Sequence, residues 1–161
     1  MPVSDELACP LLRVFGRLEY QLKRRSRFIR VGPRDAMVDW TKVQDAVVDL
    51  PHDDFLAQMS ATVMRKVLGG ARDRPRVQVV EVIDGRRRRA HFVARNLDAA
   101  DARALVQATR RVRNNLFHGG KEDPGEQPFD GDDDEWAQAA LDIATVLLEL
   151  VEQGRFGPPE P

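Results

Sequence analysis

Apolar residues recur at helical spacing along most of this chain, and this periodicity limits its possible folds more than any other feature. The first stripe runs through Leu7, Leu11, Phe15, Leu18 and Leu22, at steps of four and three. Similar stripes begin at Trp40, Phe55, Leu105 and Trp136. Each stripe makes one face of an amphipathic helix, which must be buried against another helix. The pattern therefore predicts an all-α fold, an up-and-down bundle of about five helices.

Capping residues and helix-breaking residues mark the ends of the expected helices. The expected N-terminal caps are Ser4, Asp53 or Asp54, and Asp98. The expected breaks are Gly32-Pro33, Pro51, Gly69-Gly70, Gly119-Gly120 and Gly154. We expect residues 154–161 to form a loose tail.

Residues 72–95 interrupt the helical rhythm between the third and fourth helices. Two apolar arms flank Asp84-Gly85, a dipeptide that suits a two-residue type I′ turn. The segment is thus read as a short basic β-hairpin or an irregular insertion. Because the alternation in the first arm is imperfect, a kinked helix is the competing interpretation.

The length and the N-terminal sequence predict one soluble domain. A chain of 161 residues is enough for a single core, so we expect residues 1–161 to form one domain. The one cysteine, Cys9, cannot form an intramolecular disulfide, and the first residues do not resemble a secretory leader. No stretch approaches the roughly 20 apolar residues of a membrane span. We therefore expect a cytoplasmic protein with no membrane association.

The charge of the chain is strongly divided. Residues 1–121 hold 24 basic against 14 acidic residues, a net charge of +10, whereas residues 122–161 hold 1 against 12, a net charge of −11. A basic body favours a polyanionic partner. The acidic loop at 122–133 leads into the carboxylates that precede the fifth helix, where caps and the helix dipole favour them, so its expected role is mainly structural.

The interrupting segment is rich in arginine. Its arginines are Arg72, Arg74, Arg76, Arg86, Arg87, Arg88, Arg89 and Arg95. Two interpretations stay open: a solvated face, or an arm that contacts the phosphates of RNA through planar guanidinium groups. Such contacts would position RNA without reading its sequence.

The stretch VRNNLFHGGK at residues 112–121 carries the strongest functional signal. It places Arg113, Asn114 and His118 near the end of the fourth helix. A permanently charged arginine and a histidine that titrates near neutrality suit metal-free cleavage of an RNA phosphodiester. No cluster of side chains has the spacing of a metal site, so we expect neither a metal nor another cofactor.

The helical positions of these residues suggest a site shared by two chains. At about 100° per residue, His118 lies about 140° around the helix from Arg113, and Arg110 and Phe117 lie on the same arc. Such an arc would face a second surface, most simply the same helix of a twofold-related copy. The sequence therefore predicts a homodimer.

With R-N-x-x-x-H near the end of a penultimate helix, the chain resembles the HEPN superfamily (higher eukaryotes and prokaryotes nucleotide-binding). The stretch FGRLEYQLKR in the first helix is similar to a pattern of some bacterial HEPN proteins. The resemblance covers two helices closely, and the rest of the chain only in its helical layout. It implies a metal-independent endoribonuclease with a composite dimer site, of the kind found among toxins and phage-defence effectors.

The resemblance also implies roles for individual residues. His118 would act as general base on the ribose 2′-hydroxyl or as acid to the leaving oxygen, and Arg113 would stabilise the transition state. Asn114 would orient the phosphate or His118, and the products would carry a 2′,3′-cyclic phosphate. Glu19 and Lys23 would line the cleft. The other expected RNA-binding residues are Arg86, Arg87, Arg88, Arg89, Arg110 and Lys121. A toxin of this kind would have a cognate antitoxin as a partner.

Simpler interpretations of the same residues stay open. His118 can cap helix carbonyls, Arg113 can pair with Glu19, and Glu19 with Lys23 can form an ordinary ion pair along one helix. The alternative functions are a non-catalytic HEPN module that binds nucleotide, RNA or a partner protein, and a purely structural dimerisation domain.

Overall fold

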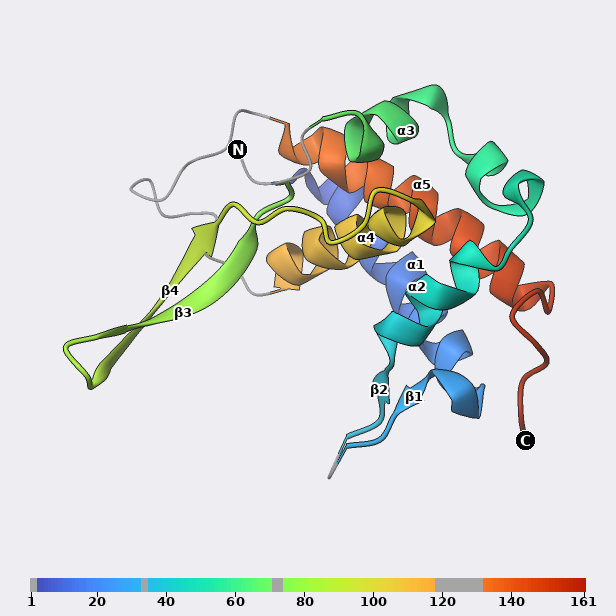
Figure 1. Ribbon diagram of the computed structural model, residues 1–161, viewed down its shortest axis with the longest axis horizontal. Helices are drawn as coiled ribbons and strands as arrows, with labels where there is room; N and C mark the ends of the chain where they lie inside the picture. Colours follow the sequence, from blue (N-terminus) through green and yellow to red (C-terminus); the bar gives the residue numbers. More distant parts are fainter. Residues whose placement is uncertain (1–2, 33–34, 71–73, 118–131) are drawn as a thin grey trace.

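The computed structural model describes residues 3–32, 35–70, 74–117 and 132–161. The two longest helices, α1 (Asp5–Lys23) and α5 (Asp133–Glu152), pack against each other, and α4 (Ala102–Phe117) packs on α5 (Figure 1). Two shorter helices, α2 (Trp40–Val48) and α3 (Ala61–Leu68), lie against α4. His118, Lys121 and most of the expected acidic loop lie outside the described residues.

The prediction of an all-α bundle is wrong, because the fold is mixed α/β, although mostly helical. Two separate antiparallel sheets of two strands are present: β1 (Ile29–Arg30) with β2 (Met37–Val38), and β3 (Val77–Ile83) with β4 (Arg87–Val93). Strands β1 and β2 flank the expected break at Gly32-Pro33. With two residues each, they are too short for the alternation that marks a strand in sequence.

Strands β3 and β4 form a hairpin that we call the arm, residues 77–93, which projects from the helical body (Figure 1). Asp84 and Gly85 both have positive φ, 53° and 68°, as a type I′ turn requires. The register pairs Ile83 with Arg87 next to the turn and Val77 with Val93 at the base. The hairpin interpretation of this segment therefore agrees with the structure, and the kinked helix does not.

The third helix is shorter than predicted. In place of a helix that starts at Asp53 or Asp54, the chain forms two 3₁₀ turns, η2 (His52–Asp54) and η3 (Leu56–Gln58). Helix α3 begins only after Ser60, whose Oγ accepts a hydrogen bond from the Val63 amide at 3.2 Å. Phe55 is still buried in the core, although it does not lie on the face of a helix.

The core lies between α1 and α5 and continues under α4. The fully buried side chains of α1 are those of its predicted stripe, Leu11, Phe15, Leu18 and Leu22. Phe15 also stacks on Trp40 of α2 with ring centroids 5.1 Å apart. None of the helices within the described ranges is long and apolar enough to span a bilayer.

The segment after α5, which we expected to be a loose tail, packs against the body. Phe156 is 2% exposed and meets the Phe28 ring edge-on at 6.0 Å. The buried guanidinium of Arg25 donates to the carbonyl oxygens of Gln21, Val151 and Gly157. One arginine thus ties the ends of α1 and α5 to the C-terminal residues.

Candidate functional site

The last two turns of α4 carry the candidate site on one side of the helix. Arg110, Arg113 and Asn114 fall within about 100° of one another, because residues three and four apart share a helix face. This face meets α1 and the start of α2, where the stacked pair Phe15 and Trp40 supplies an aromatic surface. The helix therefore presents two guanidinium groups toward that aromatic pair.

Arg113 is held by polar and aromatic contacts together. Its Nη1 donates to the Asn114 side-chain oxygen at 3.0 Å, and its Nη2 donates to Oε2 of Glu19 at 3.3 Å. The guanidinium carbon lies 5.1 Å from the Phe15 ring centre and 4.4 Å from that of Phe117. The side chain is 25% exposed, so its charge is partly shielded from water. Arg113 therefore forms the ion pair with Glu19, and both residues also border the expected cleft.

Arg110 lies one turn earlier, over the Trp40 ring at 5.5 Å. Its burial, followed by the positive charge of Arg113, lowers the pKa of Arg110, while Glu19 acts in the opposite direction. An arginine stays charged at any physiological pH. The two guanidinium groups therefore repel each other at close range, and an anion bound between them would relieve this repulsion.

These side chains border a cleft of about 710 Å³. We call it the cationic cleft; its basic residues are Lys23, Arg30, Arg110 and Arg113, and its acidic residues are Glu19 and Asp39. Glu19 is engaged by Arg113, and Asp39 accepts a hydrogen bond from the Lys42 amide as the cap of α2. The excess of positive charge and the paired carboxylates make this cleft suited to phosphate groups.

The structure brings together most of the residues expected at the cleft. Arg113, Asn114, Arg110, Glu19 and Lys23 all border it. The sequence did not identify Arg30 or Trp40 as part of this site. Arg30 comes from β1, which pairs with β2, the strand that packs against α1, and these two-residue strands leave no sequence signal.

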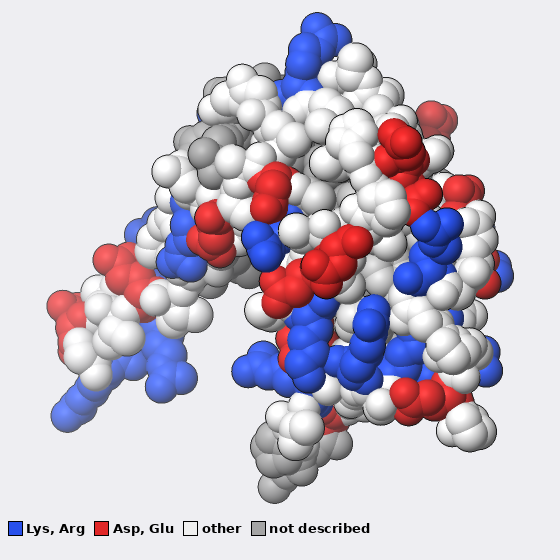
Figure 2. Space-filling model, turned by 45° about the vertical axis from the view of Figure 1, so that its right-hand side comes forward, with Lys and Arg blue, Asp and Glu red and all other residues white. Residues whose placement is uncertain are grey.

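The four consecutive arginines of the arm are placed elsewhere. Arg86, Arg87, Arg88 and Arg89 are all exposed at the turn and the start of β4, and Arg87 pairs with Asp84 at 3.3 Å. Figure 2 shows basic side chains on the projecting arm and along the lower part of the body, with open space between the two (Figure 2). The arm and the cleft are thus two separate basic surfaces.

Two buried polar residues of α4 attach the arm to the body, and sequence reasoning missed both. Arg111 is 8% exposed and Asn115 is 5% exposed. They continue the buried stripe of Ala104 and Ala108 at steps of four and three. Two polar residues on a stripe of small buried residues are a signal that could have been found, because buried polar groups need hydrogen-bond partners.

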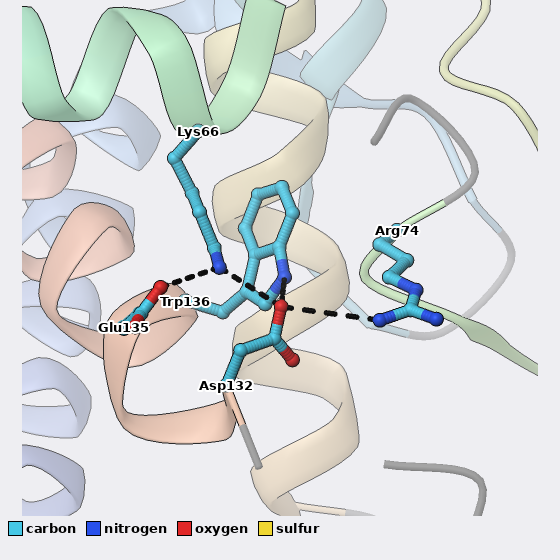
Figure 3. Close-up of polar contacts among 5 residues, drawn as sticks. All are labelled: Lys66, Arg74, Asp132, Glu135 and Trp136. Carbon is cyan, nitrogen blue, oxygen red and sulfur yellow. Dashed lines mark hydrogen bonds and ion pairs between the residues drawn. The ribbon is translucent and has the colours of Figure 1, made fainter. Parts of the chain in front are cut away.

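A second polar cluster anchors the start of α5 (Figure 3). The ammonium group of Lys66 lies 2.8 Å from Oδ2 of Asp132 and 2.7 Å from Oε2 of Glu135. The same Asp132 oxygen accepts a hydrogen bond from the Trp136 indole at 3.1 Å and lies 4.0 Å from Nη1 of Arg74. This supports the structural interpretation of the carboxylates before α5, because they join α3, α5 and the segment that leads into the arm.

Other kinds of site find less support among the described residues. Within those ranges no group of three or more His, Cys, Asp or Glu side chains could hold a metal ion. Comparison with protein-family models, with curated proteins and with solved structures finds no match for this chain. The function therefore has to be inferred from the cationic cleft and the arm.

Proposed function

We propose that the protein is a metal-independent endoribonuclease of the HEPN type. The observation that supports this most is the setting of Arg113, which lies beside Asn114 and Glu19 in the cationic cleft. Partly buried guanidinium groups can stabilise the charge that develops on a phosphate during cleavage. His118 follows the last described residue of α4 by one position, and we assign it the proton-transfer role.

The proposed reaction needs only the RNA and these side chains. His118 takes the proton from a ribose 2′-hydroxyl, and the 2′-oxygen attacks the adjacent phosphorus. The bond from phosphorus to the 5′-oxygen breaks, and a protonated histidine, supplied by the second copy in a dimer, gives its proton to that leaving oxygen. The products are a 2′,3′-cyclic phosphate and a 5′-hydroxyl. Arg113 stabilises the charge on the equatorial oxygens, and Asn114 orients the phosphate.

The same proposal includes the partners. Two copies related by a twofold axis would bring two sets of Arg113 and His118 into one site. The substrate is RNA in the cytoplasm, and a cognate antitoxin would restrain the activity if the protein acts as a toxin. The oligomeric state is open to direct measurement by analytical ultracentrifugation, where a homodimer has twice the 18.2 kDa of one chain.

We predict that Arg113→Ala and His118→Ala each reduce RNA cleavage at least about 100-fold, because each removes a group that acts in the transition state. Purified variants are incubated with mixed RNA in EDTA, and the product ends are analysed for cyclic phosphate. Arg65→Ala and His52→Ala, at exposed positions outside the cleft, are the matched controls and should cleave normally. Unchanged cleavage by His118→Ala, or loss of wild-type cleavage in EDTA, would contradict the proposal.

A non-catalytic module that binds RNA or nucleotide is the second candidate. It is favoured by the fact that the basic residues of the cleft and the arm are present whatever the role of His118. In that case RNA should bind without being cut, and binding should weaken steeply with salt. His118→Ala would then bind RNA as well as the parent chain does.

A further inference from the structure

Helix α4 holds the arm by both of its ends. The Arg111 guanidinium donates to the carbonyl oxygens of Pro75 at 3.4 Å and Asn96 at 2.8 Å, and also to that of Arg95. Pro75 precedes β3, whereas the other two residues follow β4. The Asn115 amide adds a hydrogen bond to the Arg76 carbonyl at 2.9 Å. Both ends of the arm are therefore fastened to the helix that also carries Arg113.

These hydrogen bonds are buried or partly buried, so they hold the arm at a defined place. Arg111 donates to three backbone carbonyl groups, and its burial lowers its pKa without removing its charge. Buried hydrogen bonds to a charged group are among the stronger ones in proteins. The position of the arm relative to the cleft is thus set by two residues of α4 that lie on the other side from Arg113.

A second hollow lies at the base of the arm and shares one lining residue with the cleft. It has a volume of about 270 Å³ and lies between the start of β3 and the end of α4. Its lining residues are Arg76, Val77, Gln78, Arg111, Asn114 and Asn115. Asn114 borders both this hollow and the cationic cleft. A chain that leaves the cleft past Asn114 therefore arrives at the base of the arm.

The arm is long and positively charged. Residues 77–93 contain four arginines and two carboxylates, Glu81 and Asp84. Strands of seven residues extend about 23 Å, at roughly 3.3 Å per residue. A single strand that follows the arm over this length presents several successive phosphates to it. Val80 and Val82 are 66% and 59% exposed on one face, where Arg88 pairs with Val82 across the strands, so this face combines apolar surface with one of the arginines.

We propose that the cationic cleft and the arm form one continuous path for a single strand of RNA, so that the protein selects strands long enough to reach along the arm. This inference rests on the proposed function for its ligand. A single strand is favoured over a duplex, because it can bend past Asn114, whereas a two-stranded ribbon does not enter the deep and narrow major groove of A-form RNA. The cleft holds the reacting phosphate, and the arm holds the phosphates that follow it.

The experiment compares RNA strands of increasing length. The strands carry 2′-O-methyl groups, which remove the attacking hydroxyl, and range from about 4 to about 14 nucleotides. We expect the wild-type chain to bind the longest strand at least about 10-fold more tightly than the shortest, with the gain complete at about 10 nucleotides. Fluorescence anisotropy at several salt concentrations measures both the affinity and its dependence on salt.

The arm variant replaces Arg86, Arg87, Arg88 and Arg89 by Gln. It should bind the shortest strand as tightly as the wild type does, but its affinity should not increase with the length of the strand. Its salt slope on the longest strand should fall by up to about 3, since each lost phosphate contact contributes about 0.7 on a single strand. The matched control replaces Arg13, Arg17, Arg65 and Arg155 by Gln, which removes the same charge from exposed positions away from the cleft.

Each outcome decides the inference independently of the proposed function. An affinity that does not rise with length, or an arm variant that weakens short and long strands equally, overturns the continuous path even if the wild type cleaves RNA. A length gain that only the arm variant loses supports the path even if unmodified RNA is never cut. An equal loss in the control variant would show a general charge effect and overturn it.

Discussion

The guanidinium group of Arg113 is held by polar and aromatic contacts together. Its two terminal nitrogens donate to Glu19 and Asn114, and the rings of Phe15 and Phe117 cover its carbon. Its Nε is buried and has no hydrogen-bond partner among the described residues. A planar guanidinium can make these contacts together, whereas the ammonium group of a lysine cannot. The ion pair with Glu19 that the sequence left as an ordinary alternative is therefore part of the same arrangement that would present Arg113 to a phosphate.

The contacts of Asp132 also depend on its negative charge. Burial opposes its ionised form, but the hydrogen bond from Lys66 and the charges of Lys66 and Arg74 outweigh this and lower the pKa of Asp132 below its ordinary value of 3.8. Burial also opposes the charged form of Lys66, but its hydrogen bonds to Asp132 and Glu135 raise the pKa of Lys66 above 10.5. The ion pair between Asp132 and Lys66 therefore stabilises the fold fully at pH values between 3.8 and 10.5.

We predict that Asp132→Asn lowers the free energy of unfolding by about 1–3 kcal/mol at neutral pH, because a partly buried Lys66 loses one of its two carboxylate partners. A group with a depressed folded pKa stabilises above its unfolded pKa and loses this effect as the pH falls through the folded value. The difference between wild type and variant should thus shrink as the pH is lowered from neutral to below 3.8. Denaturant unfolding at both pH values measures it.

The control for this prediction is Asp49→Asn, at an exposed position after α2. It should change the free energy of unfolding by less than about 0.5 kcal/mol at either pH. An Asp132→Asn variant whose destabilisation is the same at low and neutral pH would show that the charge of Asp132 is not what holds this cluster together.

Among the elements, the arm is the one that depends most on others. A hairpin of two strands is marginally stable by itself in water. At its base, Arg111 and Asn115 of α4 donate hydrogen bonds to the residues that flank it, and Arg74 before β3 lies near Asp132. Helix α4 therefore serves both the cleft and the arm, with different residues on different sides.

We predict that Asn115→Ala speeds amide hydrogen exchange throughout β3 and β4, because the variant loses the bond to the Arg76 carbonyl and leaves that group buried without a partner. Helices α1 and α5 should keep their protection, since their contacts with each other do not involve Asn115. Hydrogen exchange read by mass spectrometry measures both regions. Equal protection of the arm in variant and wild type would show that Asn115 does not hold it.

The elements also differ in how far their sequence revealed them. Helices α1, α2, α4 and α5 follow their apolar stripes, and Asp84-Gly85 marks the turn of the arm, because both signals are local. Strands β1 and β2 left no such signal at two residues each. The stripe through Phe55 and Met59 was misleading. Both side chains are buried, but the two residues flank a 3₁₀ turn and do not belong to an α-helix.

In the whole molecule, the packing of α1 on α5 supports the site. The inner side of α1 places Leu18 and Leu22 in the core, both 0% exposed, while Glu19 and Lys23 one residue further on reach the cleft. The same helix therefore determines both the stability of the fold and one wall of the cationic cleft.

We predict that Leu18→Ala lowers the free energy of unfolding by about 2–5 kcal/mol, because it leaves a cavity between the two longest helices. Val48→Ala, at a position 39% exposed on α2, is the control and should cost less than about 1 kcal/mol. Thermal and denaturant unfolding measure both. If Leu18→Ala lowered the free energy of unfolding as little as Val48→Ala does, Leu18 would not be part of the hydrophobic core.

Helical periodicity, turn chemistry and the R-N-x-x-x-H stretch are local, so they could be read along the chain and gave the main helices, the arm and the motif. The cleft depends on contacts that no local pattern contains: Glu19 meets Arg113 across 94 positions, and Arg30 joins them through a hairpin of two-residue strands. The attachment of the arm by Arg111 and Asn115 is of the same kind, because buried polar groups find their partners only when distant segments pack.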